Sequence, residues 1–300
     1  MLFGLKKIFF YTINNLFIFY LSIKNKLSTK SELSKYGFIK FKSKKSKDLT
    51  FYLNKIINDP ENVENSPLGY FKIINKNNFG IKDIAVDSSS EFLTKYVFTE
   101  EILSHINNFF GRKFYLRNNP IIKFNYDGEK ENTQLFHVDG GLRQVTVMIN
   151  LIDLDAHNTH MDYISGSNNQ YFFYNTPNRF NKKLQLKLEQ LVLKNKILKT
   201  TGPSGTVSIF NAGNGYHRQV GGGKRCILHM NFVDNLLHTD WSKNWKPGSV
   251  KFLSEEAANA YYFSWKNESA KNQKQKNHFA EIFSLVNRNK KEFAPLIYKT

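Results

Sequence analysis

The stretch Phe136-His137-Val138-Asp139-Gly140 and the β-branched run that follows it, Val145-Thr146-Val147-Met148-Ile149-Asn150-Leu151-Ile152, decide the fold of this chain. The run has the composition and length of a core strand. Side chains alternate along an extended strand, so His137 and Asp139 are predicted to point to the same face. H-x-D patterns are common by chance, and the neighbouring strand is what makes this one a candidate metal site.

The predicted strand at 145–152 has two unlike faces. One face is entirely aliphatic and suits a protein core, whereas the other carries Thr146, Met148 and Asn150. Polar groups on a buried face are costly unless they have hydrogen-bond partners. A bound molecule or water would supply such partners, so we predict that Thr146 and Asn150 help to bind a cofactor.

Strand-like runs continue on both sides of this stretch. Residues 120–126 precede it, 206–210 and 224–232 follow it, and clusters of Gly, Asn, Ser and Pro separate the runs. The regular alternation of strands and helices that a parallel sheet requires is not visible. The pattern predicts a mainly β fold with flanking helices (α+β), built as a sandwich or barrel.

A second imidazole lies downstream of the strand predicted at 206–210, in the segment Gly215-Tyr216-His217. If the fold brings His217 beside His137 and Asp139, the three complete a 2-His-1-carboxylate facial triad, which leaves positions of an iron(II) ion open. We therefore predict that His137, Asp139 and His217 are the metal ligands and the catalytic residues of a non-haem iron oxygenase.

Arg225 begins the last predicted strand and shares a face with Ile227, so its guanidinium is predicted to approach the inside of the sheet. A buried charge needs a partner of opposite charge, and the sequence offers no obvious carboxylate. The planar guanidinium suits a carboxylate held through two parallel hydrogen bonds. The far carboxylate of a keto-acid co-substrate is the expected partner. The alternative is that Arg225 lies at a solvated strand end.

Residues 99–235 resemble the phytanoyl-CoA dioxygenase-like family of iron(II)/2-oxoglutarate oxygenases. Four segments carry the resemblance: a helix-like stretch at 99–111, Phe136-His137-Val138-Asp139-Gly140-Gly141, the turn region at 160–167, and Gly215-Tyr216-His217-Arg218 with Arg225. The resemblance implies a double-stranded β-helix, which is a jelly roll of the cupin kind. Ser165 and Asn168 stand where the family often has Pro and His, so a reshaped loop is expected there.

The resemblance also implies a chemistry. His137, Asp139 and His217 would bind Fe(2+), and Arg225 would bind the C5 carboxylate of 2-oxoglutarate. Such enzymes use O2 to convert 2-oxoglutarate to succinate and CO2 while they hydroxylate a C–H bond, and ascorbate serves as a reductant. Asp139 argues against a halogenase, in which a halide takes the position of the carboxylate.

No motif identifies the substrate. Gln134, Arg143 and His160 are expected near the mouth of the site and are the predicted substrate-binding residues. For His160 the alternative is a surface histidine, because it lies close to His157 in a segment with loop character. A small-molecule or lipid-like substrate is expected.

The 300 residues suffice for one substantial core with appendages. We predict four segments: an apolar N-terminal helix at 1–27, a mixed helical and polar extension at 28–98, the double-stranded β-helix core at 99–240, and a charged helical segment at 241–300. The first is short for a membrane span, so it is expected to anchor the protein at a membrane or to pack on the enzyme. Without a signal-cleavage site, the predicted location is the cytoplasm.

The net charge of +18 invites a nucleic-acid or membrane partner. The basic residues are spread along the chain among Asn, Ile and Phe, however, and no nucleic-acid motif accompanies them. A nucleic-acid partner is therefore not predicted, and an anionic substrate stays open. Neither charge nor composition predicts an oligomeric state.

Two other classes of function remain open from the sequence. Another metal-dependent cupin enzyme would also cluster histidines, but it would not need Arg225. A non-catalytic jelly-roll protein that binds a ligand or associates with a membrane would hold the three ligand-type residues together by coincidence.

Overall fold

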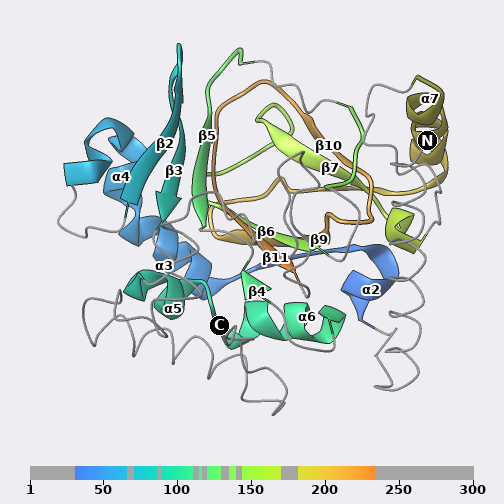
Figure 1. The fold of residues 1–300 in the computed structure, drawn as a ribbon, viewed down its shortest axis with the longest axis horizontal. Coiled ribbons are helices and arrows are strands. Elements are labelled where there is room, and N and C mark those ends of the chain that lie inside the picture. Colours follow the sequence, from blue (N-terminus) through green and yellow to red (C-terminus); the bar gives the residue numbers. More distant parts are fainter. Residues whose placement is uncertain are drawn as a thin grey trace, which may run out of the picture.

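The computed structural model of the chain describes residues 31–65, 71–86, 90–110, 115–116, 120–129, 135–139, 144–169 and 182–233. Antiparallel strands dominate this part of the chain and form two sheets. The fold is mainly β with a few flanking helices, a jelly roll as the sequence predicts (Figure 1).

The large sheet has eight strands in the order β1-β9-β6-β11-β5-β3-β2, with β4 paired to one end of β11. Its central strands are those that the sequence predicts from their β-branched and aliphatic runs. The strands are β1 (Phe38–Lys42), β2 (Phe71–Asn77), β3 (Gly80–Val86), β4 (Tyr115–Leu116), β5 (Ile121–Asn125), β6 (Gln144–Asn150), β9 (Thr206–Asn211) and β11 (Arg225–Val233).

The small sheet has three strands in the order β10-β7-β8, namely β7 (His160–Ile164), β8 (Ile197–Lys199) and β10 (His217–Val220). It lies across from β6, β9 and β11 (Figure 1). Aromatic rings fill the space between the two sheets. The Phe38 ring lies 5.7 Å from the Tyr163 ring and 6.2 Å from the Phe210 ring, centroid to centroid. This contact fixes the spacing of the sheets near the candidate site.

The opposite face of the large sheet packs against helices. On β6, Val145, Val147 and Ile149 are fully buried in the main core, whereas Met148 belongs to the cluster between the sheets. Side chains alternate along β6, so its aliphatic side chains face the helices. The side chains on its other face point into the interior of the jelly roll, as predicted from the sequence. In Figure 1 this helical side is formed by α3 (Lys44–Tyr52), α5 (Glu91–Tyr96) and α6 (Glu100–Phe110).

Helix α6 shows how the local sequence sets an element. The Thr99 hydroxyl accepts a hydrogen bond from the backbone N–H of Ile102 at 3.4 Å, and two glutamates occupy the first turn. Both features stabilise a helix N-terminus.

The remaining helices of the described residues are α2 (Glu32–Tyr36), α4 (Asn54–Asn58), α7 (Lys182–Lys194) and the 3-10 turns η1 (Pro60–Asn65) and η2 (Ser167–Asn169).

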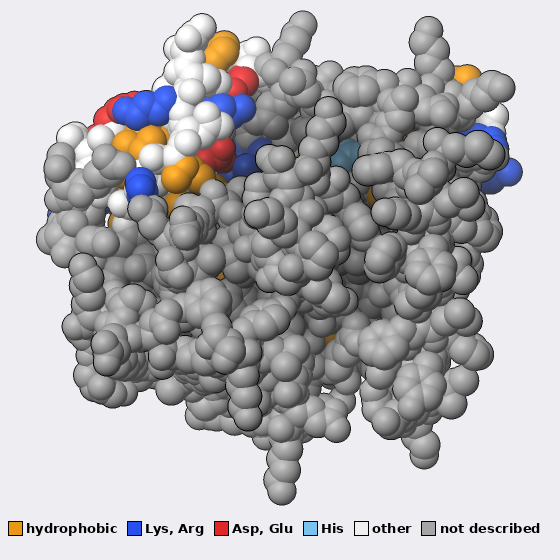
Figure 2. Space-filling model, viewed as in Figure 1, with side chains coloured by type: hydrophobic (Ala, Val, Ile, Leu, Met, Phe, Trp, Pro, Cys, Tyr) orange, Lys and Arg blue, Asp and Glu red, His pale blue; other side chains and the backbone are white. Residues whose placement is uncertain are grey.

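Three strands of the large sheet come from residues 28–98, the segment predicted as a mixed helical and polar extension. β1 pairs with β9, and the β2–β3 hairpin pairs with β5. The sheet therefore runs across the boundary that the sequence predicts at residue 99. Figure 2 shows charged side chains of both signs over this part of the molecule. On β2, Lys76 pairs with Glu61 at 2.9 Å.

The predicted apolar helix at 1–27 and the predicted charged segment at 241–300 lie outside the described residues. Among the helices that are described, none is long and apolar enough to cross a membrane.

Truncation of Phe38 should test whether β1 is part of the folded core. Phe38 is 5% exposed and lies between two rings, so Phe38→Ala should lower the free energy of unfolding by about 3–5 kcal/mol. The matched change Phe51→Ala removes a ring that is 85% exposed and should cost no more than about 0.5 kcal/mol. Urea unfolding measures both, and equal effects would contradict the placement of β1.

Candidate active site

His137 and His217 are held side by side by the backbone. The His137 N–H donates to the His217 carbonyl at 2.9 Å, and the His217 N–H donates to the His137 carbonyl at 3.0 Å. The two residues thus form a hydrogen-bonded antiparallel pair at the edge of the small sheet. Their rings lie 4.5 Å apart, centroid to centroid.

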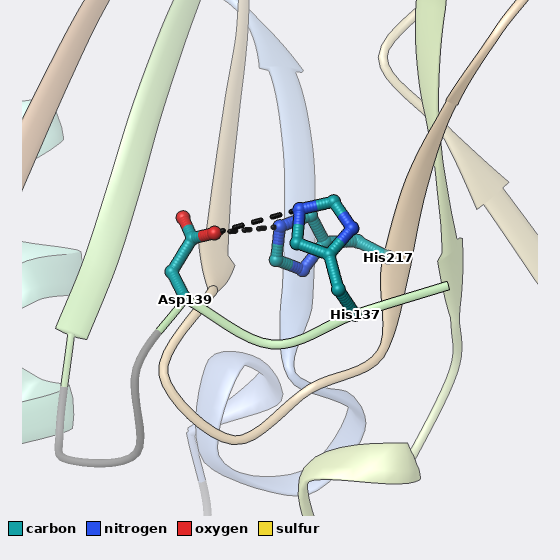
Figure 3. A group of neighbouring side chains, drawn as sticks. All are labelled: His137, Asp139 and His217. Atoms are coloured by element: carbon teal, nitrogen blue, oxygen red, sulfur yellow. Dashed lines mark ion pairs between the residues drawn. The ribbon is translucent and has the colours of Figure 1, made fainter. Parts of the chain in front are cut away.

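Hydrogen bonds to its backbone and to its side chain hold Asp139 so that it faces the two rings. Its N–H donates to the Ala212 carbonyl at 2.8 Å, and Oδ2 accepts from the Gln144 amide at 3.3 Å. Oδ1 then lies 3.6 Å from His137 Nε2 and 3.5 Å from His217 Nε2 (Figure 3). The alternation predicted from the sequence does place both side chains on one side.

The orientation of each ring is set by a backbone carbonyl two residues upstream. His137 Nδ1 lies 2.9 Å from the Leu135 carbonyl, and His217 Nδ1 lies 3.0 Å from the Gly215 carbonyl. An imidazole that donates from Nδ1 keeps a lone pair on Nε2, which is the arrangement typical of metal-bound histidines. Gly215 is required here, because a Cβ on this residue would collide with Tyr163.

The charges of Asp139 and His217 support one another. Desolvation alone would raise the pKa of Asp139, but the neighbouring imidazoles of His217, His137 and His229 together outweigh it and hold the pKa below its ordinary value. Burial alone would lower the pKa of His217, but Asp139 outweighs it and the pKa lies above its ordinary value. The carboxylate is therefore ionised, and His217 holds a proton more tightly than a free histidine does.

The three side chains have the chemistry and spacing of a metal site. Their ligand atoms all lie within 4.8 Å of one another. Protein nitrogen and oxygen ligands bind divalent metals at about 2.0–2.2 Å, so small side-chain shifts would bring all three into contact with one ion. Two imidazoles and one carboxylate suit iron(II) and leave room for further ligands.

Arg225 begins β11 of the large sheet and reaches the small sheet through Gln219 of β10. It is 4% exposed, and its Nε donates to Asn125 Oδ1 at 2.7 Å across the β5–β11 pair. Its NH2 group donates to Gln219 Oε1 at 3.2 Å. Gln219 follows His217 by two residues on β10, a rise of roughly 7 Å. The guanidinium thus lies inside the jelly roll, bonded to the strand that carries His217.

The side chains of Thr146 and Asn150 already have protein partners. The Thr146 hydroxyl donates to Asn231 Oδ1 at 2.7 Å. The Asn150 amide nitrogen donates to the carbonyls of Thr200 and Gly202, each at 3.1 Å, which joins β6 to the loop before β9. Their predicted role in cofactor binding stays a prediction.

His160 lies on the outer face of the small sheet, because its neighbours Met161 and Tyr163 point to the space between the sheets. It is 2% exposed, and its Nε2 lies 3.5 Å from Asp162 Oδ1. The structure therefore does not bring His160 to the three metal-ligand residues. Gln134 and Arg143, the other predicted substrate-binding residues, lie outside the described residues.

Asn125 and Gln219, which bond to Arg225, were not predicted from the sequence. Gln219 had a local signal, since it lies two residues from His217 on a strand and so points to the same side. Asn125 had none, because it is 100 residues from Arg225 in the chain.

The fold of this chain is similar to that of EctD from S. alaskensis. EctD with bound Fe superposes with a TM-score of 0.52 at 16% identity, over 69% of this chain and 76% of EctD. EctD with 2-oxoglutarate and 5-hydroxyectoine gives a TM-score of 0.50 at 16% identity, over 69% of this chain and 75% of EctD. At this identity the likeness establishes the fold. No protein-family model matches the sequence, and no curated protein is significantly similar to it.

Addition of Fe(2+) under anaerobic conditions should stabilise the protein. At a metal concentration about 100-fold above Kd, binding to the folded state contributes about 2.7 kcal/mol, so the Tm should rise by several degrees. His217→Ala and Asp139→Ala should abolish this rise, whereas His157→Ala, which removes an exposed loop histidine, should preserve it. A rise that survives loss of Asp139 would exclude this metal site.

The affinity for the metal should fall as the pH is lowered. A metal binds the neutral imidazole, and Asp139 raises the pKa of His217, so protons compete with the metal at a higher pH than for an ordinary histidine. Calorimetric titration in buffers of different ionisation enthalpy should detect proton release on binding. An affinity that does not change between about pH 8 and pH 6 would contradict the coupling of His217 to Asp139.

Proposed function

We propose that this protein is an iron(II)/2-oxoglutarate-dependent dioxygenase that hydroxylates a C–H bond of a small-molecule or lipid-like substrate. In this reaction 2-oxoglutarate and O2 would be consumed, and succinate and CO2 would be released, with ascorbate as a reductant. His137, Asp139 and His217 would hold the iron, and Arg225 would bind the co-substrate. The resemblance to the phytanoyl-CoA dioxygenase-like family is part of the same proposal.

The contact of Arg225 with Gln219, which follows His217 by two residues on β10, is the observation that carries the proposal. Three carbon–carbon bonds of about 1.5 Å separate the keto carbon of 2-oxoglutarate from its C5 carboxylate. With a metal–oxygen bond of about 2 Å, the acid reaches roughly 6 Å from the metal. Gln219, the side chain that Arg225 contacts, follows His217 by a backbone rise of roughly 7 Å, which is a length of the same order.

The residues around the triad suit a reaction that must exclude water. The Phe210 ring lies 5.4 Å from the His217 ring, centroid to centroid, and Phe38 and Met148 belong to the same apolar cluster. Iron and 2-oxoglutarate would supply the oxidising chemistry. The protein would hold the ligands in one orientation through the Leu135 and Gly215 carbonyls. Apolar rings of this kind exclude water on the His217 side, while the Asp139 side chain keeps an exposed fraction of 34%.

The comparison with EctD supports the proposal at the level of the fold. Structures of EctD hold Fe in one case, and 2-oxoglutarate with 5-hydroxyectoine in another. A fold of this type is therefore able to hold both the metal and the co-substrate. The buried Arg225 favours this function over another metal-dependent cupin enzyme, because such an enzyme would not need a guanidinium for a keto-acid co-substrate.

The proposal predicts succinate formation that depends on Arg225. With Fe(2+), ascorbate, O2 and 2-oxoglutarate, the full chain should release succinate, and Arg225→Ala should reduce release at limiting 2-oxoglutarate by at least about tenfold, as expected for loss of a charge-assisted pair. Arg218→Ala is the matched control. Arg218 belongs to the outer face of the small sheet, where it pairs with Glu189 at 2.6 Å, so its loss should leave the KM for 2-oxoglutarate unchanged.

Equal losses in the two arginine variants would show that the effect is not specific to the proposed co-substrate site. No succinate from the iron-loaded wild-type protein, with or without candidate substrates, would overturn the proposed function itself.

A further inference from the structure

A chain of buried polar side chains leads away from Arg225. Asn125 accepts from Arg225 Nε through Oδ1 at 2.7 Å, and its Nδ2 donates to Glu129 Oε2 at 3.4 Å. All three residues are nearly inaccessible, with exposed fractions of 4% for Arg225, 1% for Asn125 and 6% for Glu129. Buried polar groups that are connected in this way are held in one arrangement, because each lost bond leaves an unsatisfied group.

Glu129 is itself fixed from three sides. Its Oε1 lies 2.8 Å from Lys82 Nζ and accepts from Asn77 Nδ2 at 2.6 Å. Its Oε2 accepts from the backbone N–H of Tyr126 at 3.3 Å. Lys82 and Asn77 lie on the two strands of the β2–β3 hairpin, so the hairpin that extends the large sheet also anchors this carboxylate.

The Asn125 side-chain amide links the orientation of the Arg225 guanidinium to Glu129. An amide presents an acceptor on one side and donors on the other, and its rotation is set by what it bonds to. Glu129 accepts only, so it holds the NH2 group of Asn125 and turns the oxygen toward Arg225. If the amide rotated by half a turn, its NH2 group would face the guanidinium, donor against donor.

Because the Asn125 amide is neutral, it does not neutralise the positive charge of Arg225. Asn125 and Gln219 both bind the guanidinium through neutral oxygens. An amide fixes the plane of the guanidinium without cancelling its positive charge, whereas a carboxylate at the same position would compete with an anionic ligand. The negative charge of Glu129 is kept one side chain farther away and is partly balanced by Lys82.

We propose that Asn125 and Glu129 are positioning residues that orient the Arg225 guanidinium for the distal carboxylate of the keto-acid co-substrate, with the β2–β3 hairpin as their support. This inference rests on the proposed function above. It assigns to the hairpin a part in co-substrate affinity, although the three metal-ligand residues lie on other segments of the chain.

The test is 2-oxoglutarate binding to the iron-loaded full chain, measured by anaerobic calorimetry. Asn125→Asp keeps the shape of the side chain but places a carboxylate beside Arg225, and it should raise the Kd for 2-oxoglutarate at least about tenfold. Glu129→Gln removes the charge that orients the amide and should raise the Kd about three- to tenfold. The affinity for Fe(2+) should stay within about twofold in both variants, because neither residue contacts the triad.

Glu61→Gln is the matched control. It makes the same chemical change to an exposed carboxylate that pairs with Lys76 of β2, so it should leave the Kd for 2-oxoglutarate within about twofold. In turnover assays the KM for 2-oxoglutarate should rise in the Asn125 and Glu129 variants, whereas kcat at saturating 2-oxoglutarate should change little. A general loss of structure would instead lower kcat and iron affinity together.

The possible outcomes separate the two proposals. If wild-type protein binds 2-oxoglutarate and Asn125→Asp binds it equally well, the positioning role is overturned and the proposed function stands. If Asn125→Asp does not fold, Glu129→Gln decides alone, and an unchanged Kd overturns the inference. If the iron-loaded wild-type protein binds no 2-oxoglutarate, the proposed function fails and this inference fails with it.

Discussion

The reciprocal backbone hydrogen bonds between His137 and His217 are the constraint from which the rest of the site follows. They join two segments that are 80 residues apart and set the two rings next to each other. Asp139 and Gln219 each follow one of these histidines by two residues, so strand alternation carries both to the same interior. Through Gln219 the same pairing also determines where Arg225 of the large sheet meets the small sheet.

The electrostatic design of the site separates charges of opposite sign. A carboxylate lies at the ligand end, where Asp139 and His217 shift each other's pKa in opposite directions. A guanidinium lies farther inside, where it donates to the amide oxygens of Asn125 and Gln219. A ligand with a chelating end and an anionic far end is complementary to this order, because each of its ends meets a positive centre once a metal is bound.

Much of the central fold could be predicted from the sequence. β5, β6, β9 and β11 have long aliphatic or β-branched runs, and the two-faced pattern of β6 predicts which side chains meet the helices. β1 and β2 were missed because they are edge strands that contain Lys, and β2 also contains Asn and is mostly exposed. Such strands carry little periodic signal, and it is pairing with β9 and β3 that makes them strands.

Some residues of the candidate site could also be predicted from the sequence, and others could not. His137, Asp139 and His217 could be predicted to converge because their residue types and spacing are those of a metal site. The partners of Arg225 could not be, because Asn125 and Glu129 are common polar residues whose role depends on contacts across the sheet. The sequence predicts His160 near the substrate, which stays a prediction, and the structure places it on the outer face of β7. A one-residue difference in register reverses the direction of a side chain, and no local motif reveals it.

The single cysteine of the chain follows Arg225 directly and points the opposite way, into the core beneath the helices. Its thiol is fully buried, and burial raises the pKa of Cys226 well above its ordinary value. Thiol reagents attack the ionised, accessible form, so alkylation of Cys226 must wait until the central strand opens. The labelling rate of the native protein therefore reports the opening equilibrium of β11 without any engineered probe.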